Sequence, residues 1–247
     1  MTVIKSPEEV AIMRQAGKIV ATTLKRLREE IKPGIKTRNL DSVAVSELKR
    51  YGAKASFKGY RGFPAYVCVS VNDEIVHGIP GDRQLSDGDI VSLDFGAIVD
   101  GFHGDGAITV GVGRISSKAQ ELLAVTEAAL MFGIKAARDG AHLGDVSAAI
   151  QDYVETNGFS VVREYCGHGV GRNLHEDPSV PNFGLAGEGP LLKKGMTLAV
   201  EPMVTAGDWR TRLAKNRWTV LTLDGSLAAH FEHTIAISED EAEILTL

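Results

Sequence analysis

Hydrophobic residues recur with the period of an amphipathic helix in two long stretches of the chain. Ser6, Pro7 and Glu9 fit an N-cap, a first-turn proline and a capping-box acid, so the first helix is predicted to begin at Pro7. Its predicted buried face consists of Val10, Met13, Gly17, Val20, Leu24, Leu27 and Ile31. The second stretch predicts a helix from Ser117 to about Arg138. Its predicted buried residues are Leu122, Leu123, Val125, Ala129 and Ile134.

The two halves of the chain repeat each other. After each long helical pattern, two glycines 18 residues apart bracket a shorter amphipathic segment, Gly34 with Gly52 and Gly140 with Gly158, at an offset of 106. An offset of 107 relates two later series, Leu85, Gly88, Val91, Leu93 and Asp94 in one half and Leu192, Gly195, Leu198, Val200 and Glu201 in the other. Two matching registers outweigh coincidental glycine spacing. Each half is therefore predicted to contain a long helix, a second helix and then strands.

Acidic residues occupy the predicted strands. Apolar residues alternate with small or polar ones from Asp89 to Ile98, so one strand face packs on the helices and the other carries Asp94. After a turn around Asp100 and Gly101, a second strand is predicted to carry Asp105. These two acids are expected on the same side of the sheet.

The second half repeats this arrangement, with Glu201 on one predicted strand and Glu232 opening another that continues to Ile237. Two like charges 4 Å apart cost about 4 kcal/mol at an effective dielectric constant near 20. No basic residue lies near the four acids in sequence. Because two divalent cations would balance four carboxylates, the pattern predicts a two-metal site.

One histidine completes the candidate ligands. His168 is flanked by glycines, which allow close backbone approach, and the offset of 107 maps it onto Arg61 in the first half. Four carboxylates and one imidazole suit manganese, iron or cobalt, and zinc is also compatible. No catalytic role is assigned to His103, expected in the turn between the aspartates, or to His233, expected on the opposite strand face.

Composition limits the remaining possibilities. The chain has 247 residues, 44% of them hydrophobic, and a net charge of −5, and we expect one domain over 1–247 with halves at about 1–114 and 115–247. The sequence contains no basic cluster, so we do not expect a specific nucleic-acid partner. Two cysteines are too few for a disulfide framework and fit a reducing cytoplasm. No apolar signal core precedes Pro7 and no long uncharged apolar run follows, so we expect neither export nor membrane insertion.

Several motifs follow one another along nearly the whole chain: Val76–Pro80, Asp94, Asp105, Gly167–Gly171 with His175, Glu176 and Pro178, then Glu201–Pro202 and Phe231–Thr234. In combination they resemble the type I methionine aminopeptidases of metallopeptidase family M24, in their bacterial short form. The resemblance implies an α+β pita-bread fold, a curved antiparallel sheet with outer helices and internal pseudo-twofold symmetry. The 31 positions from Glu201 to Glu232 leave no space for the helical insertion of type II enzymes. Prolidase and aminopeptidase P share the ligand pattern but typically carry an added N-terminal domain, for which there is no room before Pro7.

The resemblance also implies roles for individual residues. Asp94 and Asp105 would bind one divalent metal ion, His168 and Glu201 the other, and Asp105 and Glu232 would bridge the two ions. Glu201 would double as the proton shuttle.

By resemblance, His77 and His175 would contact the substrate near the scissile amide. The pocket for the methionine side chain would be formed by Phe57, Tyr60, Phe63, Cys68 and Trp218, where aromatic rings attract a thioether. Bulk at the second substrate residue would collide with the rim near His77 and His175.

The chain departs from the family pattern at four positions. Arg61 stands where the family usually has histidine, Leu174 where some members have phenylalanine, and Ala228 and His230 replace the usual serine and glutamine. None of these changes removes a proposed ligand, although Arg61 adds a fixed positive charge near the pocket.

The expected function is removal of the initiator methionine from nascent chains with a small second residue. This function implies transient association with the ribosome, and we expect a monomer. Two alternatives stay open: a proline-directed peptidase of the same fold, and a noncatalytic module that binds peptides or protein partners.

Overall fold

Four helices give the molecule its outer layer. The structure is a computed structural model that describes residues 2–247. The helices are α1 (Pro7–Glu30), α2 (Thr37–Tyr51), α3 (Ser117–Ala136) and α4 (Leu143–Thr156), and a 3-10 turn, η1, spans Tyr60–Gly62. The predicted capping box opens α1, because the Glu9 amide donates to Ser6 Oγ at 3.3 Å and the Ser6 amide donates to Glu9 Oε2 at 3.1 Å. None of the helices within residues 2–247 is both long and apolar enough to cross a membrane.

The helix predictions hold with small shifts at the ends. Ile31 follows the last residue of α1 and is only partly buried, as is Val10. α3 begins at Ser117 as predicted, after the N-cap Ser116, and ends at Ala136, before the predicted Arg138. Helix ends are the parts of a sequence pattern that are least sharply defined.

Residues 2–247 form fifteen strands in three sheets. Their bounds are β1 (Lys54–Ala55), β2 (Cys68–Val71), β3 (Glu74–Val76), β4 (Ile90–Val99), β5 (Phe102–Gly111), β6 (Ser160–Val161), β7 (Gly167–Gly169), β8 (Glu176–Val180), β9 (Thr197–Val200), β10 (Met203–Thr205), β11 (Thr211–Leu213), β12 (Val220–Thr222), β13 (Ala228–His230), β14 (Glu232–Ala236) and β15 (Glu243–Ile244). The main sheet has nine strands in the order β1-β4-β5-β14-β9-β7-β8, with β2 paired to β4 and β15 to β14. Two three-stranded sheets have the orders β13-β10-β6 and β11-β12-β3.

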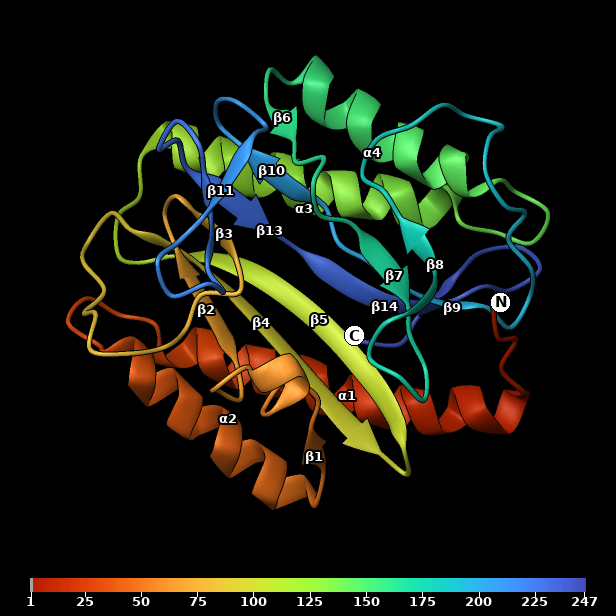
Figure 1. Ribbon diagram of the computed structural model, residues 1–247, viewed down its shortest axis with the longest axis horizontal. Helices are drawn as coiled ribbons and strands as arrows, with labels where there is room; N and C mark the ends of the chain where they lie inside the picture. The colour runs from red at the N-terminus through yellow and green to blue at the C-terminus, as the bar shows by residue number, and fades with distance from the viewer. Residues whose placement is uncertain (1) are drawn as a thin grey trace.

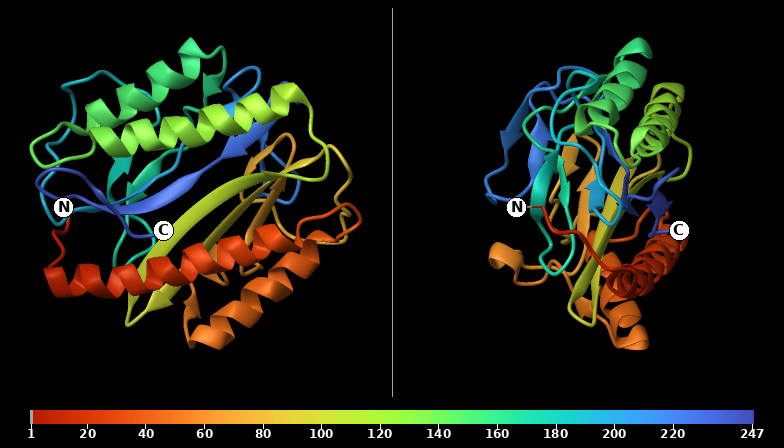
Figure 2. Two further views of the ribbon diagram at one scale, coloured as in Figure 1. Left: turned by 180° about the vertical axis from the view of Figure 1, so that it is seen from behind. Right: turned by 90° about the vertical axis from the view of Figure 1, so that its right-hand side faces the viewer.

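The helices cover one face of the curved main sheet (Figure 1), where α1 packs on β4 and β5, α2 packs on α1, and α3 packs on α4. Figure 2 shows the α1–α2 pair and the α3–α4 pair on either side of the centre of the sheet. One apolar core joins α1 and α2 to β4, and a second joins α3 and α4 to β9 and β14. The opposite face of the sheet is left to shorter strands and loops.

Corresponding hydrogen bonds confirm that the sequence repeat is structural. The Gly34 amide donates to the Leu85 carbonyl at 2.7 Å, and the Gly140 amide donates to the Leu192 carbonyl at 2.9 Å. Both bonds join the segment before the shorter helix to the segment before a central strand. The two halves therefore share a local topology as well as a residue pattern.

The β4–β5 hairpin fixes the spacing of the first two acids. Asp100 and Gly101 form its turn with φ angles of 46° and 81°, as in a hairpin turn with two left-handed residues. Asp94 lies opposite Ala107 and Asp105 lies opposite Gly96. The two aspartates are thus diagonal neighbours on the same face, not directly opposed residues.

Candidate metal centre

The structure brings the five predicted ligands together at the centre of the main sheet. Asp94 lies in β4, Asp105 in β5, His168 in β7 and Glu232 at the start of β14. Glu201 comes directly after β9 and not within it, contrary to the prediction. All five line one cavity of about 150 Å³.

Strand pairing positions these side chains. Ala199 of β9 lies opposite both His168 of β7 and Thr234 of β14, and Glu232 lies opposite Ala107 of β5. A side chain at Gly169, next to the histidine, would clash with the Asp177 carbonyl. The glycines beside His168 therefore allow the close strand packing that carries its ring into the site.

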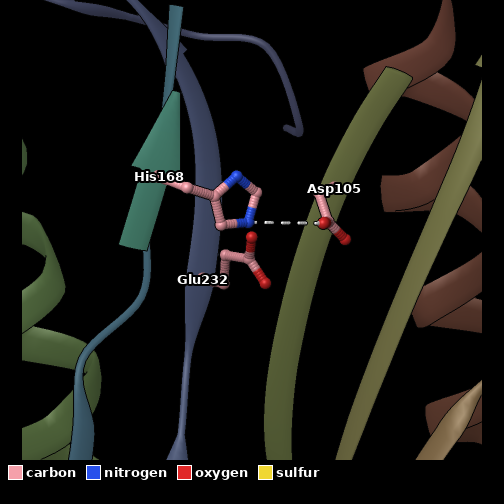
Figure 3. Close-up of side chains that lie close together, drawn as sticks. All are labelled: Asp105, His168 and Glu232. Carbon is pink, nitrogen blue, oxygen red and sulfur yellow. Dashed lines mark ion pairs between the residues drawn. The ribbon is translucent and has the colours of Figure 1, made fainter. Parts of the chain in front are cut away.

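The distances between donor atoms suit a bound cation. Figure 3 shows His168 and Asp105 facing each other above Glu232, with His168 Nε2 4.0 Å from Asp105 Oδ2. The same nitrogen lies 3.4 Å from Glu201 Oε1. Asp105, His168 and Glu232 each offer a ligand atom within 4.8 Å of the others. Two oxygens, Asp94 Oδ1 and Glu232 Oε1, are buried without a hydrogen-bond partner among the described residues.

The four acids are buried without enough nearby positive charge to balance the negative charge of their ionised forms. Burial, followed by repulsion from Asp105, raises the pKa of Asp94, Glu201 and Glu232 well above the ordinary range. Burial likewise raises the pKa of Asp105 to about 7. In the described part of the chain, ion pairs within 4.0 Å of these carboxylates involve histidines alone. Divalent cations would supply the missing positive charge, so the donor set fits metal binding.

His168 is arranged as a neutral ligand. Its Nδ1 lies 2.9 Å from the Gly169 carbonyl oxygen, which fixes the proton on that nitrogen and leaves Nε2 facing the acids. Burial, with the neighbouring charge of His175, lowers the pKa of His168 to about 3. A neutral imidazole with an unprotonated Nε2 is the form that binds metals.

His77 and His175 both line the cavity. His175 Nδ1 lies 2.9 Å from the Tyr60 hydroxyl, and the His175 ring lies 4.1 Å from the His168 ring. Burial, and then the charge of Arg61, lowers the pKa of His175. His77 follows β3 with a φ of 60°, and burial lowers its pKa to about 4. Such a backbone angle is costly for a residue other than glycine, so the surrounding contacts must hold His77 in place.

An apolar wall completes the cavity. It contains all five predicted pocket residues, which are Phe57, Tyr60, Phe63, Cys68 and Trp218. Phe63 and Trp218 meet edge to face at 5.2 Å, and Cys68 lies opposite Asp94 across the β2–β4 ladder. The cavity therefore has an acidic end and an apolar end, which adjoin where Cys68 pairs with Asp94.

Two of the departures also lie in this wall. Leu174 packs against the pocket aromatics, and Arg61 lines the cavity with its guanidinium 5.5 Å from the Tyr60 ring. The positive charge predicted near the pocket is thus present at its rim.

The predicted position of His103 is wrong, whereas the predicted position of His233 is confirmed. His103 lies inside β5 and not in the turn, buried, with Nδ1 2.9 Å from Ser56 Oγ. Its position two residues before Asp105 on a strand gives both side chains the same face, a signal that the sequence contained. His233 points away from the acids as predicted, with Nδ1 2.8 Å from Thr246 Oγ1.

Sequence reasoning missed the position of His230 beside the acids. Its Nε2 lies 3.5 Å from Glu201 Oε2 and 3.9 Å from Glu232 Oε2. The spacing of two residues between His230 and Glu232 is the signal that could have revealed it, because such residues share a face on an extended chain.

Known proteins match the chain over its full length. The model of metallopeptidase family M24 matches residues 11–239. The chain is 54% identical to methionine aminopeptidase 1 of Bacillus subtilis, over 100% of this chain and 99% of that protein. It is 51% identical to the methionine aminopeptidase of Clostridium perfringens, again over 100% and 99% of the two chains. These matches confirm the resemblance that the motifs predicted.

Solved structures confirm the predicted pita-bread fold. The methionine aminopeptidase of Thermotoga maritima superposes with a TM-score of 0.98 at 49% identity, over 100% of this chain and 99% of that one. Prolidase from Pyrococcus furiosus shares the fold with a TM-score of 0.80 at 23% identity, and this chain covers 66% of it.

Proposed function

The chain belongs to metallopeptidase family M24, and we propose that it is a metal-dependent aminopeptidase that removes the N-terminal methionine from peptides and nascent proteins. The observation that carries this proposal is the single cavity that joins a cluster of buried acids to an apolar wall. The acidic end suits metal ions and a free N-terminal amine, and the apolar end suits a thioether side chain.

The metal ligands are assigned as the motif order implied. Asp94 and Asp105 would hold one divalent ion, His168 and Glu201 a second, and Asp105 and Glu232 would bridge them. Cobalt, manganese, iron or zinc would suit these donors. When bound, such ions act as Lewis acids that polarise the scissile carbonyl and make water more acidic.

The remaining chemistry falls to side chains of the cavity. Glu201, whose pKa burial raises, is suited to accept a proton from the attacking water and pass it to the leaving amine. His175 has its Nδ1 engaged by Tyr60, which leaves Nε2 for the substrate carbonyl as negative charge develops there. His77, held at the rim with Trp218 edge-on at 6.4 Å, would orient the peptide backbone.

The size of the cavity supports recognition of one side chain. About 150 Å³ is the volume of an apolar cavity that binds benzene, and methionine has fewer side-chain atoms than benzene. Phe57, Tyr60, Phe63, Cys68 and Trp218 would contact the methionine. His77 and His175 would restrict the second substrate residue to small side chains.

The cellular setting is also part of the proposal. Removal of an initiator methionine takes place on nascent chains, so we expect transient association with the ribosome in the cytoplasm, where the two free cysteines fit a reducing environment. We expect a monomer built as one domain, because one chain supplies every candidate ligand.

The test is peptide hydrolysis by purified, metal-free protein to which manganese or cobalt is returned. Methionine should be released from Met-Ala-Ser, and Asp105→Ala or Glu232→Ala should abolish its release. Glu239→Ala, which removes an exposed acid paired with Lys194, is the matched control and should leave the rate unchanged. Efficient cleavage of Xaa-Pro dipeptides without methionine release would favour the proline-directed alternative. Tight binding of peptides without any hydrolysis would favour the noncatalytic one.

A further inference from the structure

The imidazole ring of His230 is buried beside two acids, Glu201 and Glu232. It is 1% exposed, and neither ring nitrogen has a hydrogen-bond partner among the described residues. A buried polar group without a partner is costly, so such a group in a folded protein calls for an explanation.

The separations around His230 fit two donors on one ion better than a hydrogen bond. His230 Nε2 lies 3.5 Å from Glu201 Oε2 and 3.9 Å from Glu232 Oε2, whereas N–H···O bonds usually measure about 2.7–3.2 Å. Nitrogen and oxygen donors bound tetrahedrally at about 2.0–2.2 Å lie about 3.4 Å apart. Glu201, His230 and Glu232 each place a ligand atom within 4.8 Å of the others.

The same relationship occurs on the other side of Glu201. His168 Nε2 lies 3.4 Å from Glu201 Oε1, and His230 Nε2 lies 3.5 Å from Glu201 Oε2. The carboxylate therefore has an imidazole nitrogen beside each of its oxygens, at nearly equal distances. Because His168 is assigned as a ligand, the matching position of His230 points to the same role.

The backbone holds His230 rigidly in this position. Its amide donates to Thr109 Oγ1 at 2.8 Å, and the Thr109 hydroxyl donates to the His230 carbonyl oxygen at 2.8 Å. β13 pairs with β10 through His230 and Met203. A ligand fixed by its surroundings needs little reorganisation to bind an ion.

We propose that His230 is an additional protein ligand, which together with Glu201 and Glu232 binds a divalent cation in the main-sheet cavity. The proposal rests on the two-metal site described above and extends its donor set from one imidazole to two. A second imidazole shifts the preference of the site towards cobalt and zinc and away from manganese, which favours oxygen donors. His230→Gln, which removes the imidazole, should therefore weaken binding of cobalt or zinc more than binding of manganese.

Proton NMR of the cobalt-loaded protein tests the ligand directly. Each imidazole bound to high-spin Co²⁺ through Nε2 gives an exchangeable Nδ1–H resonance far outside the ordinary range. The full chain should show two such resonances in ordinary water, from His168 and His230, and both should vanish in deuterated water after exchange. His230→Gln should show one, and calorimetry should show at least about tenfold weaker binding of one cobalt ion.

His233→Gln is the matched control. His233 lies three residues after His230, and its ring is hydrogen-bonded to Thr246 on the other side of the strand. This variant should keep both resonances and the full cobalt affinity. Circular dichroism and urea unfolding of the metal-free variants would show whether each one folds. Should His230→Gln fail to fold, the count of resonances in the unmodified chain would still decide the question.

A single shifted resonance in the unmodified chain, or equal cobalt affinity in His230→Gln, would overturn the proposal. The outcome is separable from that of the proposed function. If methionine is released but only His168 binds the metal, the proposed function holds and His230 is not a ligand. If two imidazoles bind the metal but no methionine is released, His230 is a ligand and the proposed function is wrong.

Discussion

The Tyr60 hydroxyl lies 2.9 Å from His175 Nδ1, and the two rings stack with centroids 5.3 Å apart. Tyr60 belongs to the short turn η1, whereas His175 belongs to the loop before β8, so this contact joins two segments far apart in the sequence. In the proposed function, this hydrogen bond would leave Nε2 of His175 to face the substrate. Tyr60 would thus position His175 for the reaction.

Tyr60→Phe should lower kcat/KM for Met-Ala-Ser by about tenfold, because it removes a hydrogen bond of about 1–1.5 kcal/mol and keeps the stacked ring. Initial rates over a range of peptide concentrations measure the effect. Tyr51→Phe, at the exposed end of α2, should leave kcat/KM unchanged. An unchanged kcat/KM in Tyr60→Phe would show that His175 is oriented by other contacts.

Asp105→Asn should stabilise the metal-free protein at neutral pH. The pKa of Asp105 is raised from 3.8 to about 7, so below pH 3.8 both states carry its proton and the acid has no effect on stability. As the pH rises from 3.8 to about 7, the unfolded state loses the proton first, and the wild type loses stability. The variant does not undergo this loss. The difference in unfolding free energy between Asp105→Asn and wild type should therefore shift in favour of the variant by on the order of 2–4 kcal/mol from pH 4 to pH 8.

Urea unfolding in the presence of a chelator at several pH values measures this difference. Asp100→Asn, in the exposed hairpin turn, controls for the removal of an aspartate. Added cobalt should reverse the order of stability, because it stabilises only a protein that binds it well. A difference between Asp105→Asn and wild type that does not change with pH would contradict the account of the acid cluster.

Trp218→Leu should reduce the preference for methionine over norleucine, which has a methylene group in place of sulfur. Contacts between a thioether and an aromatic ring are worth about 0.3–1.5 kcal/mol, which corresponds to about two- to tenfold in kcat/KM. Competition between Met-Ala-Ser and its norleucine analogue measures the ratio. Trp209→Leu is the matched control, since Trp209 packs against Arg163 and does not line the cavity. If the preference for methionine over norleucine fell equally in both variants, this would argue against a methionine pocket at Trp218.

Gly169→Ala should weaken both folding and metal binding, because the added methyl group would meet the Asp177 carbonyl and push β7 from β8. Overpacking of this kind costs about 1–3 kcal/mol in unfolding free energy. Gly81→Ala, where nothing lies within 4 Å of the added atom, should change little. Urea unfolding and cobalt titration of the two variants make the comparison. Normal cobalt affinity in Gly169→Ala would mean that the strand tolerates displacement without moving His168.

The features that were predicted from the sequence carry local signals. The capping box at Ser6 and Glu9 and the alternation around Asp94 depend on residues within a few positions, so they survive in any fold that buries their apolar face. The repeat supplied the long-range information, because matching acids in two halves must meet if the halves pack symmetrically. Those signals together located four helices, the central strands and the five candidate ligands.

The features that were missed depend on contacts between distant segments. β3 and β12 pair across more than 140 positions, and no local pattern specifies that pairing. The predicted turn at Asp100 and Gly101 is confirmed, but β5 begins directly after it at Phe102, so His103 lies in the strand and not in the turn. Where a strand begins after its turn depends on pairing with the neighbouring strand, which the local pattern does not specify. The position of His230 beside Glu201 results from the meeting of segments that are distant in the sequence, which no local pattern specifies.

The seam between β5 and β14 is short, with only Glu232 opposite Ala107 and His233 opposite Gly106. Asp105 and Glu232, one from each side, converge on the same cavity. Cations held by both acids would cross-link the two halves of the repeat at this short seam. Loss of metal would then loosen the whole molecule along this line, and hydrogen exchange of the seam amides would report on metal occupancy.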